Sequence, residues 1–422
     1  MRLDLTDMLH ALSFALDKVE AELLGIDTGH GRRVAAISLL MGEAAGFNKE
    51  ELRDFVGCCL LHDSALVEFI REELSNSVMS EDLHVDLFEI ATKSKSKMHR
   101  DHSVIGEQNM RLLPFRTDVK NVVLYHHENA DGTGILRMTA AQTPLKAQIL
   151  HLVDSIDTAS HLHLETMTME EYETLCEWVK SKTGSMFSPE ASALFFQGVT
   201  YDKIALLQEK RLLFYLHDVL YQEMVDYNDE EIHNIAKFLA NIIDYKSEFT
   251  EYHSMGVAEK AELMARHCGF DQDKTLRFFF AGAMHDIGKL MVTNGILEKP
   301  GKLTDDEFTE MKHHAAGTRY ILSQIKGIDD IVSWASNHHE KLNGKGYPRG
   351  LTAQELSFED QLMACIDIYQ ARTEKRPYKD GMSHEKAISI LKDMAGRGEL
   401  NAHIVHDLDL VMGSACQSPA TV

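Results

Sequence analysis

The sequence predicts an all-α protein made of two tandem helical domains that are related by internal duplication. Three observations support this fold class. Apolar residues recur with the 3.6-residue period of a helix in six segments, whereas the period-two alternation of strands is short and rare. The 422 residues include only 7 Pro and 26 Gly, a composition that favours long helices. A set of His, Asp and apolar residues also recurs at a nearly constant offset, which indicates a repeat.

The predicted helices follow one another through both halves of the chain. They cover residues 5–24, 31–46, 202–224, 229–244, 254–269 and 384–396. Gly46 and Gly269 end two of them, because glycine accepts the left-handed conformation just past a last helical turn. The first and fourth helices carry matching apolar stripes, formed by Leu9, Leu12, Leu16 and Val19 in one and by Ile232, Ile235, Leu239 and Ile242 in the other.

A polar, acidic segment separates the two halves. Residues 225–231 read VDYNDEE, in which Asn228 and Asp229 can cap the helix that follows. We therefore expect two domains, 1–222 and 223–422.

The offset between the two copies locates equivalent residues. It is 223 for His30 and His253, and for the His-Asp pairs that begin at positions 62 and 285. It falls to 212 for His102 and His314 and for the His-His pairs at 126 and 338, and becomes 213 for Asp154 and Asp367. One insertion of about 11 residues in the first copy accounts for the drop from 223 to 212.

Net charge and cysteine content limit which binding partners and which cellular location are expected. The 43 Lys and Arg against 66 Asp and Glu give a formal net charge of −23, which disfavours polymeric nucleic acid and anionic membranes as partners. A small anionic substrate remains compatible if metal ions supply local positive charge. The six cysteines show no CxxC pairing, so we expect reduced thiols and a cytoplasmic location. No signal peptide and no apolar run of the ~18–20 residues needed to span a membrane is found, so membrane insertion is not expected.

The repeated His and Asp residues form a candidate metal site in the second copy. Imidazole nitrogens and carboxylate oxygens together suit divalent transition metals better than Ca²⁺ or Mg²⁺. Seven such groups exceed the needs of one ion but suit two ions that share a bridging carboxylate. The set is His253, His285, Asp286, His314, His338, His339 and Asp367.

Short motifs around these residues carry a family resemblance. HDIGK at 285–289, KPGKL at 299–303, HHE at 338–340, GKGYP at 344–348 and RPY at 376–378 resemble the HD-GYP family, within the HD superfamily of metal-dependent phosphohydrolases. The resemblance covers residues 230–400 and implies a helical HD-type fold with a bi- or trinuclear iron or manganese centre. It also implies cleavage of cyclic di-GMP to the linear dinucleotide and sometimes on to GMP, while some members prefer 3′,3′-cyclic GMP-AMP. Both tandem domains are therefore expected to be of the HD type.

The resemblance implies roles for residues of the second copy. Asp286 would bridge two ions, and a hydroxide between them would attack phosphorus. Lys289 would contact phosphate or assist the leaving group. The implied ligands are His253, His285, Asp286 and Asp367 for one ion, and Asp286, His314, His338 and His339 for the other. The implied substrate contacts are Gly346, Tyr347 and Pro348 in the pocket wall, with Arg319 and Arg349 as candidates because they lie near the motifs.

The number of metal ions follows from one further position. A trinuclear member would carry a glutamate four residues before its first ligand histidine, where this chain has Phe249. We therefore expect two divalent transition-metal ions in the C-terminal domain, with iron or manganese as the first choice and other divalent ions as alternatives.

The first copy keeps the ligand set but loses the other motif residues. Leu66 stands where the second copy has Lys289, and Ile135 and Leu136 stand where it has Tyr347 and Pro348. We expect a degenerate HD domain that is regulatory or dimerising, in which the retained residues either bind metal or are packed relics. These residues are His30, His62, Asp63, His102, His126, His127 and Asp154.

Three functions remain open at this point. The favoured one is a cyclic-dinucleotide phosphodiesterase that acts on cyclic di-GMP first and 3′,3′-cyclic GMP-AMP second. The alternatives are an HD phosphohydrolase for other phosphate esters and a non-catalytic, metal-containing sensor module. A homodimer is a further expectation, because helical HD domains often pair.

Overall fold

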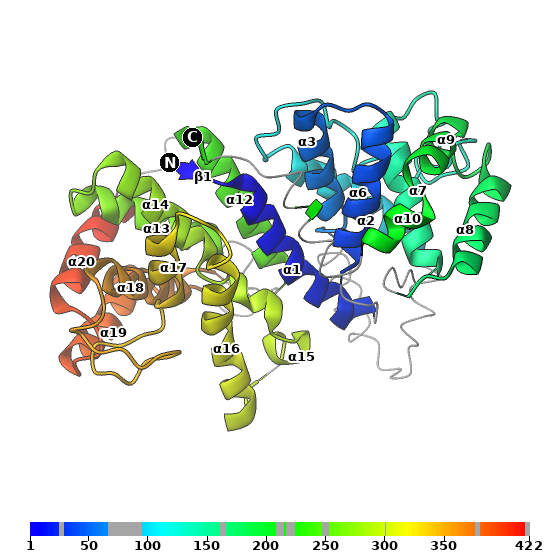
Figure 1. The fold of residues 1–422 in the computed structure, drawn as a ribbon. Coiled ribbons are helices and arrows are strands. Elements are labelled where there is room, and N and C mark those ends of the chain that lie inside the picture. Colours follow the sequence, from blue (N-terminus) through cyan, green and yellow to red (C-terminus); the bar gives the residue numbers. More distant parts are fainter. Residues whose placement is uncertain are drawn as a thin grey trace. The chain divides into compact units, whose positions relative to one another are not determined.

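The computed structural model describes residues 1–24, 29–65, 95–160, 166–207, 215–216, 224–246, 253–299, 301–375 and 380–417 (Figure 1). The chain divides into two compact units. The N-terminal unit is Leu5–Glu223, and the C-terminal unit combines Met1–Asp4 with Met224–Val422. Almost every described element is a helix, which confirms the all-α fold class. No described helix is both long and apolar enough to cross a bilayer.

The described elements of the N-terminal unit are all helices. They are α1 (Leu5–Leu24), α2 (His30–Ala44), α3 (Lys49–Leu60), α6 (Lys95–Met110), α7 (Leu145–Ser160), α8 (Met169–Lys182), α9 (Pro189–Gly198) and α10 (Tyr201–Leu206).

The C-terminal unit adds one short pair of strands to its helices. Its elements are β1 (Arg2–Leu3), β2 (Val225–Asp226), α12 (Asp229–Tyr245), α13 (His253–His267), α14 (Gln272–Met284), the 3-10 helix η2 (Ile287–Met291), α15 (Asn294–Leu297), α16 (Asp305–Leu322), α17 (Asp329–Ser336), α18 (Phe358–Thr373), α19 (His384–Gly396) and α20 (Ala402–Gln417).

The predicted duplication appears in the order of the helices. The helices α1, α2, α3, α6 and α7 correspond to α12, α13, α14, α16 and α18. Both predicted apolar stripes are buried in their cores. Gly46 and Gly269 have φ angles of 77° and 74°, the left-handed conformation expected past a helix end. Asn48 and Asp271, also 223 residues apart, cap the next helices by accepting hydrogen bonds from backbone N–H groups.

The segment between the two copies combines an expected cap with an unexpected strand. Asn228 caps α12 in a capping box with Glu231, as its sequence predicts. Just before it, β2 pairs antiparallel with β1, so the first four residues belong to the C-terminal unit. A two-residue strand has too little periodicity to be detected from sequence.

One expected helix is described only at its start. The prediction of one helix over 202–224 is wrong at both of its described ends, because α10 stops at Leu206 and Met224 is not helical; residues 208–214 and 217–223 lie outside the described residues.

Candidate metal centre

The seven predicted ligands of the second copy meet at one place in the C-terminal unit. The helix α13 packs against α14 and α18, and α16 packs against η2 and α17, so six elements converge there. All seven side chains are buried except that of His339, which is 27% exposed. They are His253 at the start of α13, His285 and Asp286 after α14, His314 in α16, His338 and His339 after α17, and Asp367 in α18.

One half of the centre surrounds Asp367 Oδ1. The Nε2 atoms of His253 and His285 lie 3.2 Å and 3.7 Å from this oxygen. The same two nitrogens lie 3.8 Å and 3.2 Å from Asp286 Oδ2. Two nitrogens and two carboxylate oxygens therefore face a shared point, as around a single ion.

The other half contains three histidines and the second oxygen of Asp286. His314, His338 and His339 each offer a nitrogen within 4.8 Å of the others. The Nε2 atoms of His314 and His338 lie 3.5 Å and 3.8 Å from Asp286 Oδ1. Asp286 thus directs one oxygen to each half, the arrangement of a bridging carboxylate.

The histidine rings are oriented for metal binding. The Nδ1 atoms of His285, His314 and His338 donate to backbone carbonyls of Gly282, Met311 and Ala335, at 2.8, 2.6 and 2.6 Å. These bonds fix the tautomer and leave each Nε2 with a lone pair. All three Nε2 atoms are buried and lack a hydrogen-bond partner among the described residues. Buried unsatisfied nitrogen beside carboxylate fits a divalent transition metal.

Electrostatics keep these groups in the protonation states of metal ligands. Burial and neighbouring positive charge lower the pKa of His314 and His338, and burial is the main cause that lowers the pKa of His339 to about 3. Burial alone would raise the pKa of Asp286, but Lys289 and His285 outweigh it and hold that pKa well below the usual range. His314, His338 and His339 therefore present neutral imidazoles beside an ionised bridging carboxylate.

Glu374 is a member of the site that sequence reasoning missed. Its Oε2 accepts from His253 Nδ1 at 2.8 Å and from Gln370 Nε2 at 3.1 Å. Burial lowers the pKa of His253, but the hydrogen bonds to Asp367 and Glu374 outweigh it and raise that pKa to about 9. A carboxylate seven residues after Asp367, directly past the end of α18, was the available signal. Gly256 provides the space, since a Cβ there would collide with Gln370.

Lys289 and Tyr347 lie beside the ligands. The Nζ atom of Lys289 is 2.6 Å from Asp286 Oδ2, so the amine contacts the carboxylate that both halves share. The ring of Tyr347 lies 4.7 Å from that of His339, between centroids. The remaining sequence candidates lie further out: Arg319 donates to Asn337 Oδ1 at 3.1 Å, and Arg349 is exposed.

The loop that carries Tyr347 and Pro348 is organised by Glu340. Its carboxylate accepts from the backbone N–H groups of Arg349, Gly350 and Leu351 at 2.7, 3.1 and 2.9 Å. Gly346 passes so close to Glu340 and Lys341 that a Cβ would collide with their backbone. The glutamate of the HHE motif therefore shapes the loop, a role that the motif alone did not reveal.

The first copy brings its seven predicted ligands together as well. Asp63 Oδ2 lies 3.8 Å and 3.4 Å from the Nε2 atoms of His30 and His62, and its Oδ1 lies 3.4 Å and 3.8 Å from those of His102 and His126. Asp154 Oδ1 lies 3.3 Å from His30 Nε2, and Asp154 Oδ2 lies 3.8 Å from His127 Nδ1. Leu66, Phe249 and residues 376–378, on which other expectations rest, lie outside the described residues.

Comparison with known proteins agrees with this picture. Two family models, both described as an HD domain, match residues 28–159 and 237–404, which together make up more than half of the chain. The chain is 26% identical over 417 residues to 3′3′-cGAMP-specific phosphodiesterase 1 of Vibrio cholerae, covering 95% of this chain and 90% of the relative. It is 31% identical over 195 residues to the cyclic di-GMP phosphodiesterase response regulator RpfG of Xanthomonas campestris, covering 46% of this chain and 49% of that protein.

A solved structure shares the fold along nearly the full length. The crystal structure of a cyclic GMP-AMP-specific phosphodiesterase of V. cholerae (V-cGAP3) aligns with a TM-score of 0.60 at 21% identity, covering 98% of each chain. Two family-model matches, two sets of converging ligands and the HDIGK and GKGYP motifs lead to one assignment. The chain belongs to the HD-domain family, with two HD domains in tandem, the second of which is of the HD-GYP type.

Proposed function

We propose that the C-terminal unit hydrolyses a phosphodiester bond of a cyclic dinucleotide and releases the linear dinucleotide. One observation carries the proposal. Seven candidate ligands, six of them buried, form two groups that share Asp286, and Lys289 contacts that same carboxylate. The relatives named above support the substrate class, since both are named as cyclic-dinucleotide phosphodiesterases.

Two divalent transition ions would occupy the centre. His253, His285, Asp286 and Asp367 would hold one, and Asp286, His314, His338 and His339 the other. Such ions supply a nucleophilic water near neutral pH and neutralise phosphate charge. Iron and manganese both suit this mixture of nitrogen and oxygen donors.

The remaining residues act on the substrate. Lys289 is 17% exposed, and its amine can donate a hydrogen bond to a phosphate oxygen while it stays near Asp286. Tyr347, half-buried beside His339, offers an aromatic wall against which a base or ribose can pack. Gly346 and Pro348 hold the loop, and Arg349 is the exposed cation at its end. Arg319 supports the loop region through Asn337 and is a weaker candidate for substrate contact.

The tandem arrangement favours 3′,3′-cyclic GMP-AMP as the first substrate to test. The relative that matches along 90% of its own length is named for this nucleotide. The cyclic di-GMP relative described above matches along only about half of its length. This reverses the order that the motifs alone suggested.

An anaerobic turnover assay on the full chain tests the proposal. Mn²⁺ or Fe²⁺ is added, 3′,3′-cyclic GMP-AMP, cyclic di-GMP and cyclic di-AMP are supplied separately, and products are resolved by chromatography. We expect a linear dinucleotide from 3′,3′-cyclic GMP-AMP, and none from an Asp286→Ala variant. No product from any of the three, with metal shown by elemental analysis, would contradict hydrolysis and favour a sensor role.

Two expectations accompany this function. The five described cysteines are free thiols, which agrees with the proposed cytoplasmic location. A homodimer remains a prediction, to be measured by light scattering on the metal-loaded chain.

A further inference from the structure

We infer that Thr318 is a positioning residue of the C-terminal centre. Its hydroxyl completes the turn that carries Asp286 and Lys289, and it thereby leaves the Asp286 carboxylate free to face both groups of ligands. The inference rests on the proposed function only where turnover is concerned, because the hydrogen bonds and the metal affinity can be measured without a substrate.

The turn between α14 and η2 needs an acceptor for its backbone. The helix α14 ends at Met284, and η2 begins three residues later at Ile287. The first N–H groups of a helix have no acceptor within that helix, and an aspartate just before it usually accepts from one of them. Asp286 occupies this position, but its side chain accepts no such bond. Its carboxylate faces the histidines and Lys289 instead.

Thr318 supplies the missing acceptor from another helix. Its Oγ1 atom accepts from the N–H group of Gly288 at 3.0 Å and donates to the carbonyl of His285 at 2.8 Å. Gly288 is the second residue of η2, so the hydroxyl of α16 acts where an N-terminal cap of η2 would act. Because Thr318 and Gly288 are both buried, bulk water does not replace these bonds when the hydroxyl is removed.

The same hydroxyl is linked to a ligand of the second group. His314 lies four residues before Thr318 on α16, so both side chains point to one side of that helix. A Cβ at Gly288 would collide with the backbone of these two residues, which shows how closely the turn and α16 approach. The contact of 3.5 Å between Asp286 Oδ1 and His314 Nε2 spans this same junction. Thr318 therefore fixes the two elements that share the contact.

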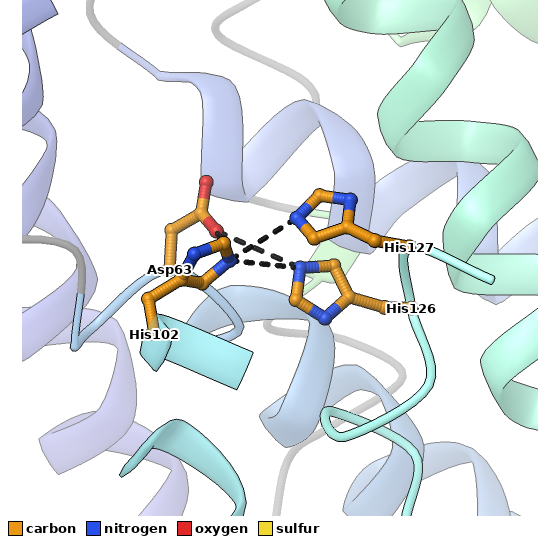
Figure 2. Close-up of side chains that lie close together, drawn as sticks. All are labelled: Asp63, His102, His126 and His127. Atoms are coloured by element: carbon orange, nitrogen blue, oxygen red, sulfur yellow. Dashed lines mark hydrogen bonds and ion pairs between the residues drawn. The ribbon is translucent and has the colours of Figure 1, made fainter. Parts of the chain in front are cut away.

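The N-terminal unit lacks this hydroxyl. Asp63 also lies among histidines there, as Figure 2 shows. Gly106 takes the position of Thr318, and a Cβ added to it would lie 3.5 Å from the carbonyl oxygen of His62, the equivalent of His285. The backbones are thus placed alike, but glycine offers no side chain to the turn. Loss of the Thr318 hydroxyl should therefore affect the C-terminal centre and leave Asp63 and its neighbours unchanged.

Substitutions of Thr318 in the full chain test the inference through metal affinity. Thr318→Val keeps the shape of the side chain but removes both hydrogen bonds, so the Asp286 carboxylate is drawn to the unpaired N–H group of Gly288. The ions that Asp286→Ala removes should then bind about 10–100-fold more weakly, as measured by competition with a chelator of known affinity. Thr318→Ser keeps the hydroxyl and should restore most of the affinity. An affinity in Thr318→Val equal to that of the unaltered chain would overturn the inference.

Two further comparisons separate the hydroxyl from general effects of substitution. Thr309, on the exposed side of the same helix, donates to the carbonyl of Asp305 at 2.9 Å, and Thr309→Val should leave the metal affinity unchanged. If Thr318→Val does not fold, Thr318→Ala and Thr318→Ser still differ by the hydroxyl alone. Equal metal affinity in the alanine and serine variants would contradict a role for the hydroxyl.

Hydrogen exchange on the metal-free chain identifies the acceptor directly. In a peptide that spans residues 285–291, protection of the Gly288 amide should survive Asp286→Ala and be lost when Thr318→Val is added to it. Loss of protection in Asp286→Ala alone would show that Asp286 caps the turn, and the inference would be wrong.

Turnover of the metal-loaded chain gives the last test. Thr318→Val should lower kcat by about tenfold or more with little change in KM, because the hydroxyl orients the groups that act and does not contact the substrate. A raised KM with an unchanged kcat would contradict the inference. If the unaltered chain shows no turnover, the proposed function fails, whereas metal affinity and hydrogen exchange still test the role of Thr318.

Discussion

The two units carry the same ligand set in nearly the same geometry but differ in the groups around it. The first histidine lies 3.3 Å from its aspartate in the N-terminal unit and 3.2 Å in the C-terminal unit, and the His-Asp pairs are separated by 3.4 Å and 3.2 Å. Within the described part of the chain, only the C-terminal unit has a lysine on the bridging carboxylate and a tyrosine beside its last histidine. The helical scaffold thus sets ligand geometry, whereas side chains at its edge decide the chemistry.

A second difference lies behind the first histidine. In the C-terminal unit His253 donates to Glu374, which also accepts from Gln370. In the N-terminal unit His30 donates to Asp157 at 2.8 Å, and Arg33 pairs with the same carboxylate at 2.8 Å. Gly256 takes the position of Arg33. The two copies therefore orient the same ligand with carboxylates from different helical turns.

A third difference concerns how closely two backbones approach. A Cβ at Gly288 would collide with α16, and the N–H group of Gly288 donates to Thr318 at 3.0 Å. In the N-terminal unit the equivalents are Ala65 and Gly106. The glycine lies at Gly288, before α16, in the C-terminal unit, but at Gly106, within α6, in the N-terminal unit. Both units therefore keep the close backbone contact that brings His314 or His102 to its centre.

The largest expected effect is on kcat, and it should distinguish Asp286 from its N-terminal equivalent Asp63. Asp286→Ala should lower kcat by roughly 10³-fold or more, because it removes the ligand common to both metal groups. Asp63→Ala should leave kcat within about threefold, since the two centres are distinct. Turnover and metal content are measured on both proteins. A folded Asp63→Ala protein without activity would show that hydrolysis had been assigned to the wrong unit.

The next effect concerns the lysine that only the C-terminal unit has. Lys289→Ala should lower kcat by about 10²-fold through loss of a proton donor or phosphate contact. The metal content should not change, because Lys289 is not a ligand, and Lys289→Arg should recover part of the rate. Loss of metal together with activity would mean that the lysine serves to hold Asp286.

The carboxylates behind the first histidines should tune metal affinity. Glu374→Gln should weaken metal binding in the C-terminal unit by about 10–100-fold, since an amide orients His253 less well. Asp157→Asn should do the same in the N-terminal unit. Competition with a chelator of known affinity measures both, and the exposed Glu355→Gln is the control. Equal affinity in the Glu374 variant and the unaltered chain would remove Glu374 from the site.

Substituting the equivalent loop glycines of the two units should create similar collisions but have different effects on KM. Gly346→Ala forces the Tyr347 loop away from Glu340 and should raise KM about tenfold. Gly134→Ala creates a similar collision, with Asn129 N only 2.7 Å from the added Cβ, yet should leave KM unchanged. If both variants, or neither, alter KM, the loop of the C-terminal unit does not bind substrate.

The smallest expected effect is on stability. Burial is the main cause that raises the pKa of Asp244 to about 7, despite a hydrogen bond from Ser254, and the N-terminal unit has Ala21 at the equivalent position. Between pH 3.8 and about 7 the folded unit retains a proton that the unfolded chain has released, so stability falls as pH rises through this window. As the pH rises through this window, the unfolding temperature of the metal-free Asp244→Asn variant should fall less than that of the metal-free unaltered chain. If the unfolding temperatures of the two proteins changed with pH in parallel, the raised pKa of Asp244 would be contradicted.

Part of the site was predictable because its signals are local. The repeat offset located fourteen candidate ligands that the structure brings together in two groups, and helical spacing predicted α19 at 384–396 with the bounds that it has. Glu374, Glu340 and Gly288 were missed as functional or structural residues. Their roles depend on partners 121, 9–11 and 30 positions away, which no periodicity connects.

By itself the sequence determined the fold class, the duplication and the set of candidate ligands, because helix periodicity and repeated motifs are local patterns of residues. The tertiary structure alone decided that Asp286 and Asp63 face two groups at once, and which carboxylate orients each first histidine. It also decided that Arg319 donates to Asn337 and that β1 joins the C-terminal unit. Such features depend on how helices that are distant in the sequence pack together, which no local pattern of residues specifies.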